Sequence, residues 1–302
     1  MNPPHLFAPL AALLLAPLFV GLINRVKACV AGRRGPPLVQ PYRDIGKLLR
    51  RGAVYGEVTT PLVRLGPVLN LATLLVALLI VPFPGGGATV GFAGDLIVLV
   101  GLFALGRFAT VLAALDTGSS FEGMGASREM HFAALAEPAL LIALATLARI
   151  TGATDLGSIY GAMTTAGWTH DGAALALVGM SFLVLELVEN SRIPVDDPTT
   201  HLELTMIHEV MVLDHGGPDL GFIQYGAALK LWLVGALLVG LMPVPGAGPW
   251  LAGGVALLGM AGLAVAIGMI ESAMARYRLV TVPQFIVGAA TVSAVAFMVL
   301  LV

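Results

Sequence analysis

The chain has 302 residues, of which 58% are hydrophobic and only 11% are charged, and its mean hydropathy is +0.92. About a quarter of the residues in a soluble domain are charged, so this composition excludes an ordinary soluble protein and indicates an integral membrane protein. The single cysteine, Cys29, excludes internal disulfides and a four-thiolate iron–sulfur site in this chain.

A helix needs about 20 apolar residues to cross a bilayer, and eight stretches of the sequence meet this requirement. They cover approximately residues 6–25, 63–82, 94–115, 132–150, 172–190, 226–243, 249–270 and 283–302. The sequence therefore predicts an all-α integral membrane protein that forms one polytopic domain over residues 1–302.

Lysine and arginine gather in the links after the first, third, fifth and seventh predicted spans, while the opposite links contain none. These four links cover about residues 26–62, 116–131, 191–225 and 271–282. By the positive-inside rule they face the cytoplasm, and both termini face outward because the number of spans is even. We therefore expect a multi-pass protein of the cytoplasmic membrane.

Residues 41–51 in the first link have the pattern of a short amphipathic helix. Ile45, Leu48 and Leu49 fall on one side, and the cations fall on the other, namely Arg43, Lys47, Arg50 and Arg51. Such a helix either lies at the headgroup boundary of the bilayer or docks a soluble partner.

The second link, residues 116–131, is polar and contains glycine. Its Gly123-Met124-Gly125 is not a nucleotide-binding fingerprint, because no strand precedes it and the third glycine is absent. We expect a flexible loop in which Ser127 caps the helix of the fourth span.

The third link and the end of the fifth span carry the main concentration of ionisable residues. Because Asp and Glu are costly in hydrocarbon, such a cluster indicates a polar path, a cavity or a partner surface. After Asp197 or Thr200 as a cap, we predict a helix of about 15 residues with an apolar stripe. The spacing of seven between His201, His208 and His215 favours a structural or solvated role over metal binding. The stripe comprises Leu202, Met206, Val210 and Leu213; the acids are Glu186, Glu189, Asp196, Asp197, Glu203, Glu209 and Asp214.

Charged residues inside the predicted spans are few, and Arg107, Glu137 and Glu186 all fall in the inner half of the membrane. If their helices adjoin, Arg107 and Glu137 form either a static ion pair or part of a proton path. Glu186 and Glu189 are three residues apart and share one face of a helix, which leads toward the acids of the third link.

Two motifs support a family resemblance. Residues 121–130, FEGMGASREM, resemble a loop motif of the respiratory complex I subunit 1 family, the membrane subunit on which the peripheral arm docks. Residues 192–204, RIPVDDPTTHLEL, are similar to the hydrogenase branch of that family, which includes membrane subunits of formate hydrogenlyase and hydrogenase 4. Quinone-reducing members tend to have a Pro-Phe-Asp-Leu-Pro-Glu-like run at the place of Val195-Asp196-Asp197-Pro198.

The resemblance implies a subunit that docks a nickel–iron hydrogenase arm and links its redox chemistry to movement of protons or sodium ions. It implies that the nickel–iron centre and iron–sulfur clusters belong to partners and not to this chain. The partners implied are hydrogenase large and small subunits, an iron–sulfur protein and antiporter-like membrane subunits; no nucleic acid is expected. A quinone-site subunit, a passive membrane anchor and a free-standing transporter are the alternatives.

By position, the resemblance also assigns candidate roles to charged residues. The proton path comprises Glu137, Glu186, Glu189, Arg107, Glu122 and Glu129; the acidic loop or partner interface comprises Asp196, Asp197, Glu203, Glu209, Arg128 and Arg192. Docking of the soluble arm, or contact with the membrane surface, is assigned to Arg43, Lys47, Arg50 and Arg51.

Overall fold

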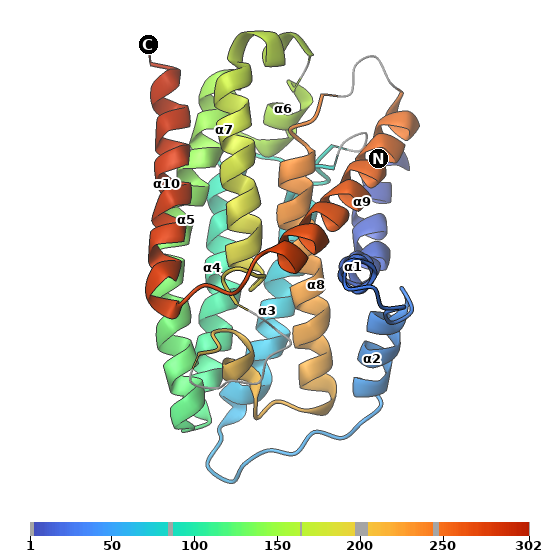
Figure 1. The fold of residues 1–302 in the computed structure, drawn as a ribbon, viewed down its shortest axis with the longest axis vertical. Coiled ribbons are helices and arrows are strands. Elements are labelled where there is room, and N and C mark those ends of the chain that lie inside the picture. Colours follow the sequence, from blue (N-terminus) through green and yellow to red (C-terminus); the bar gives the residue numbers. More distant parts are fainter. Residues whose placement is uncertain (1–2, 84–86, 164, 197–204, 244–247, 302) are drawn as a thin grey trace.

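The chain folds into a bundle of long helices (Figure 1). This computed structural model describes residues 3–83, 87–163, 165–196, 205–243 and 248–301. Within these ranges eight helices are long and apolar enough to cross a membrane, and the extended structure is limited to one isolated bridge between Phe83 and Gly87. The predicted all-α membrane fold is confirmed, while the side on which the termini lie stays a prediction.

The helices of the bundle follow the order of the predicted spans, and short helices occupy the links between them. The spanning helices are α1 (Pro3–Val30), α3 (Pro61–Ile80), α4 (Asp95–Asp116), α5 (Ser120–Thr151), α7 (Thr165–Glu189), α8 (Gly217–Val239), α9 (Pro249–Ala273) and α10 (Val282–Val299). The short elements are α2 (Gln40–Leu48), α6 (Leu156–Gly161) and the 3-10 helices η1 (Glu209–Val212) and η2 (Leu279–Thr281).

Packing between the helices places the functional residues at one end of the bundle. Helix α4 lies against α3 and α5, and α7 packs against α5, α8 and α10, whereas α9 crosses the bundle obliquely and lies against α1 (Figure 1). Buried alanines such as Ala139 and Ala143 line α5, and small residues at such interfaces let membrane helices approach closely. The charged residues of α4, α5, α7 and α8 are thereby brought together.

Helix α5 is much longer than predicted, because it begins at Ser120 and not near residue 132. The prediction of a flexible loop over residues 116–131, capped at Ser127, was therefore wrong. At 1.5 Å per residue, a helix of 32 residues is about 48 Å long, and the hydrocarbon core is about 30 Å thick. The first turns of α5 therefore extend past the hydrocarbon, where Glu122, Gly125 and Glu129 are buried against the rest of the chain.

The third link also differs from the prediction. Instead of a helix of about 15 residues, the described part of this link contains only the four-residue η1; residues 197–204 lie outside the described ranges. Met206, Ile207, Val210 and Met211 are all buried, whereas Leu213 of the predicted stripe is 45% exposed. Because the link packs into the end of the bundle on several sides, tertiary contacts replace helical hydrogen bonds.

The amphipathic helix predicted in the first link is present as α2, and it ends at Leu48, three residues earlier than expected. It packs against α8 and α1, and Ile45 and Leu48 are half-buried while Arg43 and Lys47 are exposed. Both predicted uses of the exposed side remain predictions.

Candidate functional site

Arg107, just past the middle of α4, is the centre of the charged cluster. Its side chain is buried and contacts three carboxylates from two other helices. Nε lies 2.9 Å from Glu129 Oε1, Nη2 lies 2.5 Å from Glu189 Oε2, and Nη1 donates a hydrogen bond to Glu137 Oε1. The Arg107–Glu137 pair predicted from the sequence is present, and it forms part of a larger cluster.

Lys230 supplies a second cation from α8. Its Nζ lies 2.7 Å from Glu189 Oε2, so this one carboxylate oxygen is shared between Arg107 and Lys230. Lys230 was not predicted as a site residue, although a lysine four residues into the sixth predicted span was a visible signal. A cation inside the membrane needs an anionic partner. Glu186 and Glu189, at the end of the fifth predicted span, were the candidates.

His208 connects the cluster to the third link. Its Nε2 lies 3.3 Å from Glu129 Oε2, and a third of its side chain is exposed. His208 also lines a cavity of about 10 Å³ together with Arg107, Glu129 and Glu189, which is about the space of one water molecule. No local pattern separates His208 from the two other histidines of the link, because the fold of the link decides which of them faces α5.

The charges of the cluster do not balance. When all five groups are ionised, two cations, Arg107 and Lys230, face three carboxylates, Glu129, Glu137 and Glu189. A buried ion pair stabilises little unless its geometry is good, and loss of one partner is costly. The five groups therefore carry one excess negative charge when all are ionised.

Two members of the cluster reach the surface of this chain. The side chain of Glu137 is 32% exposed, whereas that of Glu189 is 4% exposed. Together with His208, Glu137 gives the cluster two openings, one at the link and one on the flank of α5. Buried ion pairs with Arg107 therefore connect these two exposed positions.

Glu186 lies one turn before Glu189 on α7 and is completely buried. Neither of its carboxylate oxygens has a hydrogen-bond partner among the described residues. A methyl group in place of the Gly235 hydrogen would lie 3.6 Å from Glu186 Oε1, so α8 faces this carboxyl group closely. The positive charges of Arg192 and Lys230 interact electrostatically with the Glu186 carboxyl group.

Arg192 belongs to a separate ionic group at the ends of α1 and α9. Its Nη1 lies 3.4 Å from Glu271 Oε1, and Lys27 Nζ lies 2.7 Å from Glu271 Oε2. The Glu271 side chain is fully buried, so this group ties the third link to α1 and α9.

The remaining acids of this region hold the backbone of the third link. Asp196 accepts hydrogen bonds from the backbone N–H of Ile207 at 3.0 Å and of His208 at 3.2 Å, and Arg276 Nη2 lies 2.9 Å from Asp196 Oδ1. A buried link needs such partners, because unpaired backbone groups cost as much as a lost hydrogen bond. Asp196 thereby fixes the position of His208.

Two residues of α5 hold the link from the other side. Arg128 Nη1 donates to the Met206 carbonyl at 2.8 Å, and Glu122 Oε1 accepts from the Asp214 N–H at 2.9 Å. Both were predicted as functional residues, and these two hydrogen bonds connect them to the backbone of the link. Their roles in a proton path or at a partner interface stay predictions.

The other predicted residues are spread more widely. Glu209 is half-buried at the start of η1, and Asp197 and Glu203 lie outside the described residues. The four predicted docking cations are exposed on α2 and in the turn after it: Arg43, Lys47, Arg50 and Arg51.

Comparison with known proteins assigns this arrangement of helices to a known family. The family model described as NADH dehydrogenase matches residues 5–302, nearly the whole chain. The chain belongs to this family, the complex I subunit 1 family.

Relatives within the complex I subunit 1 family include components of hydrogenase complexes. The chain is 35% identical to hydrogenase-4 component C of Escherichia coli over 237 residues, which cover 76% of this chain and 71% of that protein. It is 32% identical to formate hydrogenlyase subunit 4 of Escherichia coli over 280 residues, which cover 89% of each chain. It is 26% identical to a subunit of the NADH-quinone oxidoreductase of Rickettsia prowazekii, over 62% of this chain and 57% of that one.

A solved structure has the same fold. It is a chain of a membrane-bound sulfane sulfur reductase, an archaeal respiratory membrane complex, and it matches with a TM-score of 0.85. The match covers 98% of both chains at 19% sequence identity.

Proposed function

We propose that this chain is the membrane subunit of an energy-converting nickel–iron hydrogenase complex of the formate hydrogenlyase type. In this proposal it docks the soluble hydrogenase arm and links redox chemistry there to ion translocation. The observation that carries the proposal is the row of ionisable groups from half-exposed His208 through Glu129, Arg107 and Glu189 to Lys230. The identities of 35% and 32% to two proteins of hydrogenase complexes support the choice of hydrogenase.

The proposed coupling uses the excess negative charge of the cluster. A redox change in the docked arm alters the protonation or position of the third link, which carries His208. Because His208 contacts Glu129 and Glu129 contacts Arg107, the change reaches Glu137 and Glu189. Glu137, which is partly exposed on α5, then transfers charge to neighbouring antiporter-like membrane subunits. Glu186 extends the same row toward the centre of the bundle.

Redox cofactors are assigned to partners in this proposal. The only cysteine is Cys29, which is exposed, and four thiolates are needed for an ordinary iron–sulfur cluster. The residues present therefore do not fit a cluster within this chain. The nickel–iron centre and the clusters would lie in hydrogenase large and small subunits and an iron–sulfur protein.

A second candidate function is a quinone-site subunit of an NADH dehydrogenase-like complex. It is favoured by the match to the Rickettsia prowazekii NADH-quinone oxidoreductase protein, at 26% identity. The same charged cluster would serve that function, because the two candidate functions differ in the soluble redox partner and not in this membrane subunit.

The deciding experiment is purification of the tagged native protein with its partners in a mild detergent, followed by assays for nickel, flavin and hydrogen-dependent reduction of a viologen dye. Nickel and viologen reduction should co-purify with the chain. A complex with flavin and quinone reductase activity but without nickel would instead establish the quinone-site function.

A further inference from the structure

A wide cleft lies at one end of the bundle, between the last turn of α1, the turn at residues 31–36 and the end of α9. Its volume is about 630 Å³. Lys27, Arg33 and Ser272 provide polar groups along it, and Ala28, Val30 and Pro36 are among the apolar residues that form its walls. The cleft lies outside the charged cluster of α4, α5, α7 and α8.

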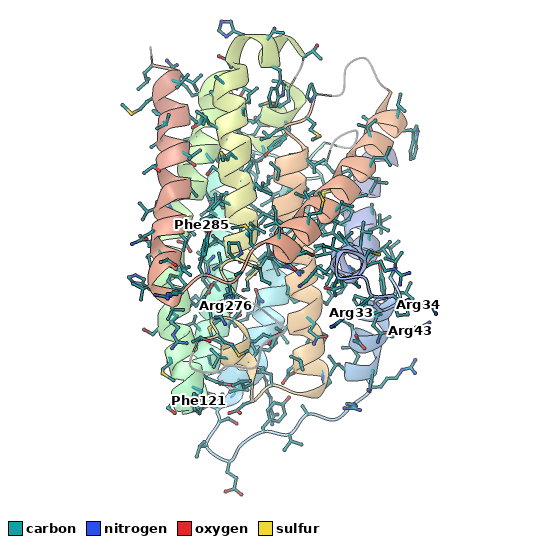
Figure 2. All side chains as sticks on the ribbon, in the orientation of Figure 1. Arg33, Arg34, Arg43, Phe121, Arg276 and Phe285 are labelled. Atoms are coloured by element: carbon teal, nitrogen blue, oxygen red, sulfur yellow. The ribbon has the colours of Figure 1, made fainter. Side chains whose placement is uncertain are left out.

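The charge around this cleft is strongly positive. The first carboxylate of the sequence is Asp44, and the five cations before it are Arg25, Lys27, Arg33, Arg34 and Arg43. Figure 2 shows Arg33, Arg34 and Arg43 on the side of the molecule occupied by α1 and α2. An anionic ligand is therefore the kind that this region attracts.

The structure leaves some of these cations available. Lys27 is neutralised by Glu271, and Arg25 donates to the carbonyl oxygens of Gly35 and Pro36 at 3.4 Å, which fixes the turn to α1. Within the described ranges, Arg33 and Arg34 are exposed and pair with no carboxylate. Their guanidinium groups can therefore bind a phosphate from outside the chain.

The position of the cleft determines which phosphate fits. Both α1 and α9 are membrane-spanning by length and composition, and the cleft lies where they end, which is the level of the lipid headgroups. Val30 in its wall is 58% exposed, and Met269, one turn before Ser272 on α9, is 51% exposed. A dissolved anion would leave these apolar side chains uncovered, whereas a phospholipid covers them with its glycerol and acyl chains.

We propose that this cleft binds the headgroup of an anionic phospholipid, with Arg33 holding the phosphate and Arg34 adding to the positive field. Basic pockets between spanning helices at the cytoplasmic surface bind acidic headgroups in this way. The bound lipid would seal the gap between α1 and α9. This gap lies beside the ion pairs of Glu271 with Lys27 and Arg192, which join α1, α9 and the third link.

Cys29 allows a direct test, because it is the sole cysteine, is exposed and lies between the cleft residues Ala28 and Val30. The full chain would be labelled there with a small fluorophore and reconstituted in phosphatidylcholine vesicles. Brominated phosphatidylglycerol or brominated phosphatidylcholine would then be added as the quencher. We expect phosphatidylglycerol to occupy the cleft about fivefold more than phosphatidylcholine at equal content, the preference that one basic side chain near the surface provides.

Variants separate a built site from general surface charge. The double substitution Arg33→Gln with Arg34→Gln should abolish the preference, while Arg33→Lys with Arg34→Lys keeps the charge and should retain most of it. Arg149→Gln with Arg278→Gln removes the same charge from two exposed positions outside the cleft and should have no effect. The proposal would be overturned if both glutamine pairs lost the preference for phosphatidylglycerol equally. It would also be overturned if the two lipids quenched the unmodified chain equally.

Inorganic phosphate distinguishes a lipid from a dissolved anion. At constant ionic strength, replacement of chloride by phosphate should leave quenching by brominated phosphatidylglycerol unchanged. If phosphate displaced the lipid and abolished the preference, the cleft would be a site for soluble anions, and the assignment to a lipid would be wrong.

Discussion

Arg107 Nη2 on α4 lies 2.5 Å from Glu189 Oε2 at the end of α7, and this contact joins two helices whose residues are 82 positions apart in the sequence. Lys230 binds the same oxygen from a third helix. Glu189 is therefore the residue on which the charges of three helices converge, and the first prediction concerns its charge.

In the proposed complex, substitution Glu189→Gln should uncouple ion movement from hydrogenase turnover. The amide keeps the shape of the carboxyl group but carries no negative charge and cannot accept a proton. Loss of a positioned proton-transfer group slows such a step about a hundredfold or more. Ion uptake by inverted membrane vesicles should fall accordingly, while viologen reduction by the soluble arm stays near normal.

The matched control for this variant is Glu57→Gln, which changes an exposed glutamate of the first link. It should leave both vesicle uptake and viologen reduction unchanged. Normal uptake by the Glu189→Gln complex would remove Glu189 from the path and favour a passive anchor.

Substitution Gly125→Ala should displace the third link from α5. A methyl group at residue 125 would lie 2.3 Å from Val210 Cγ1 and 3.0 Å from the Ile207 carbonyl oxygen, distances that require the link to move. We expect His208 to lose its contact with Glu129 and coupled ion uptake to fall. Overpacking of this kind costs about 1–3 kcal/mol, measurable as a lower midpoint of thermal unfolding.

Gly123 provides the control for Gly125, because it lies in the same helix and nothing stands within 4 Å of a methyl group there. Gly123→Ala should be neutral, or stabilising by up to about 1 kcal/mol, since alanine is the better helix former. Equal behaviour of the two variants would show that the approach of the link to Gly125 does not matter.

The spans could be predicted because a run of about 20 apolar residues has one stable form in a bilayer. The first turns of α5 could not, because Glu122 and Glu129 make residues 116–131 look like a solvated loop. This stretch becomes a buried helix only because it packs against Val210 and Met211 in the third link. That contact joins residues about 85 positions apart, and no local pattern indicates it.

The candidate site was predictable to the extent that unpaired charges in a membrane need partners. Arg107 and Glu137 could be paired on that ground, and both belong to the cluster. The convergence of Glu129 and Glu189 on Arg107 depends on how α4, α5 and α7 pack together. His208 depends in addition on the path of an irregular link, for which periodicity gives no information.

Substitution Asp196→Ala should loosen the third link. It leaves the N–H groups of Ile207 and His208 without their acceptor and Arg276 without its carboxylate. Each unsatisfied buried group costs about 1–3 kcal/mol, so the two amides should exchange hydrogen about 10- to 100-fold faster. Asp196→Asn retains an acceptor oxygen and should recover part of the protection.

Asp155→Ala is the control for this measurement. Asp155 accepts a hydrogen bond from the Ser158 N–H at 2.8 Å, as the N-cap of α6. Its loss should accelerate exchange at the start of α6 and leave Ile207 and His208 unchanged. Faster exchange of Ile207 in both variants would point to general destabilisation and against a local tie.

The docking of the third link on α3 should weaken at acidic pH because of His215. Its Nε2 lies 3.2 Å from the Val63 carbonyl oxygen, and burial lowers the pKa of His215 from its usual 6.5, more than the Val63 hydrogen bond and the charges of Asp219 and Asp214 raise it. The unfolded chain therefore takes up the proton first as pH falls. The contribution of His215 to the free energy of unfolding is fully present above pH 6.5. Below that pH it falls by at most about 1.4 kcal/mol per pH unit, until the pH reaches the pKa of His215 in the folded chain.

Substitution His215→Gln tests this origin, because the Gln amide can still donate to the Val63 carbonyl but does not titrate. Thermal unfolding of the unmodified chain should occur at a lower temperature at pH 5.5 than at pH 7.5, and this difference should shrink in the variant. His170→Gln, at a side chain that is 87% exposed, should leave the pH dependence intact. If the His215→Gln chain kept the full difference, a group other than His215 would be responsible for the pH dependence.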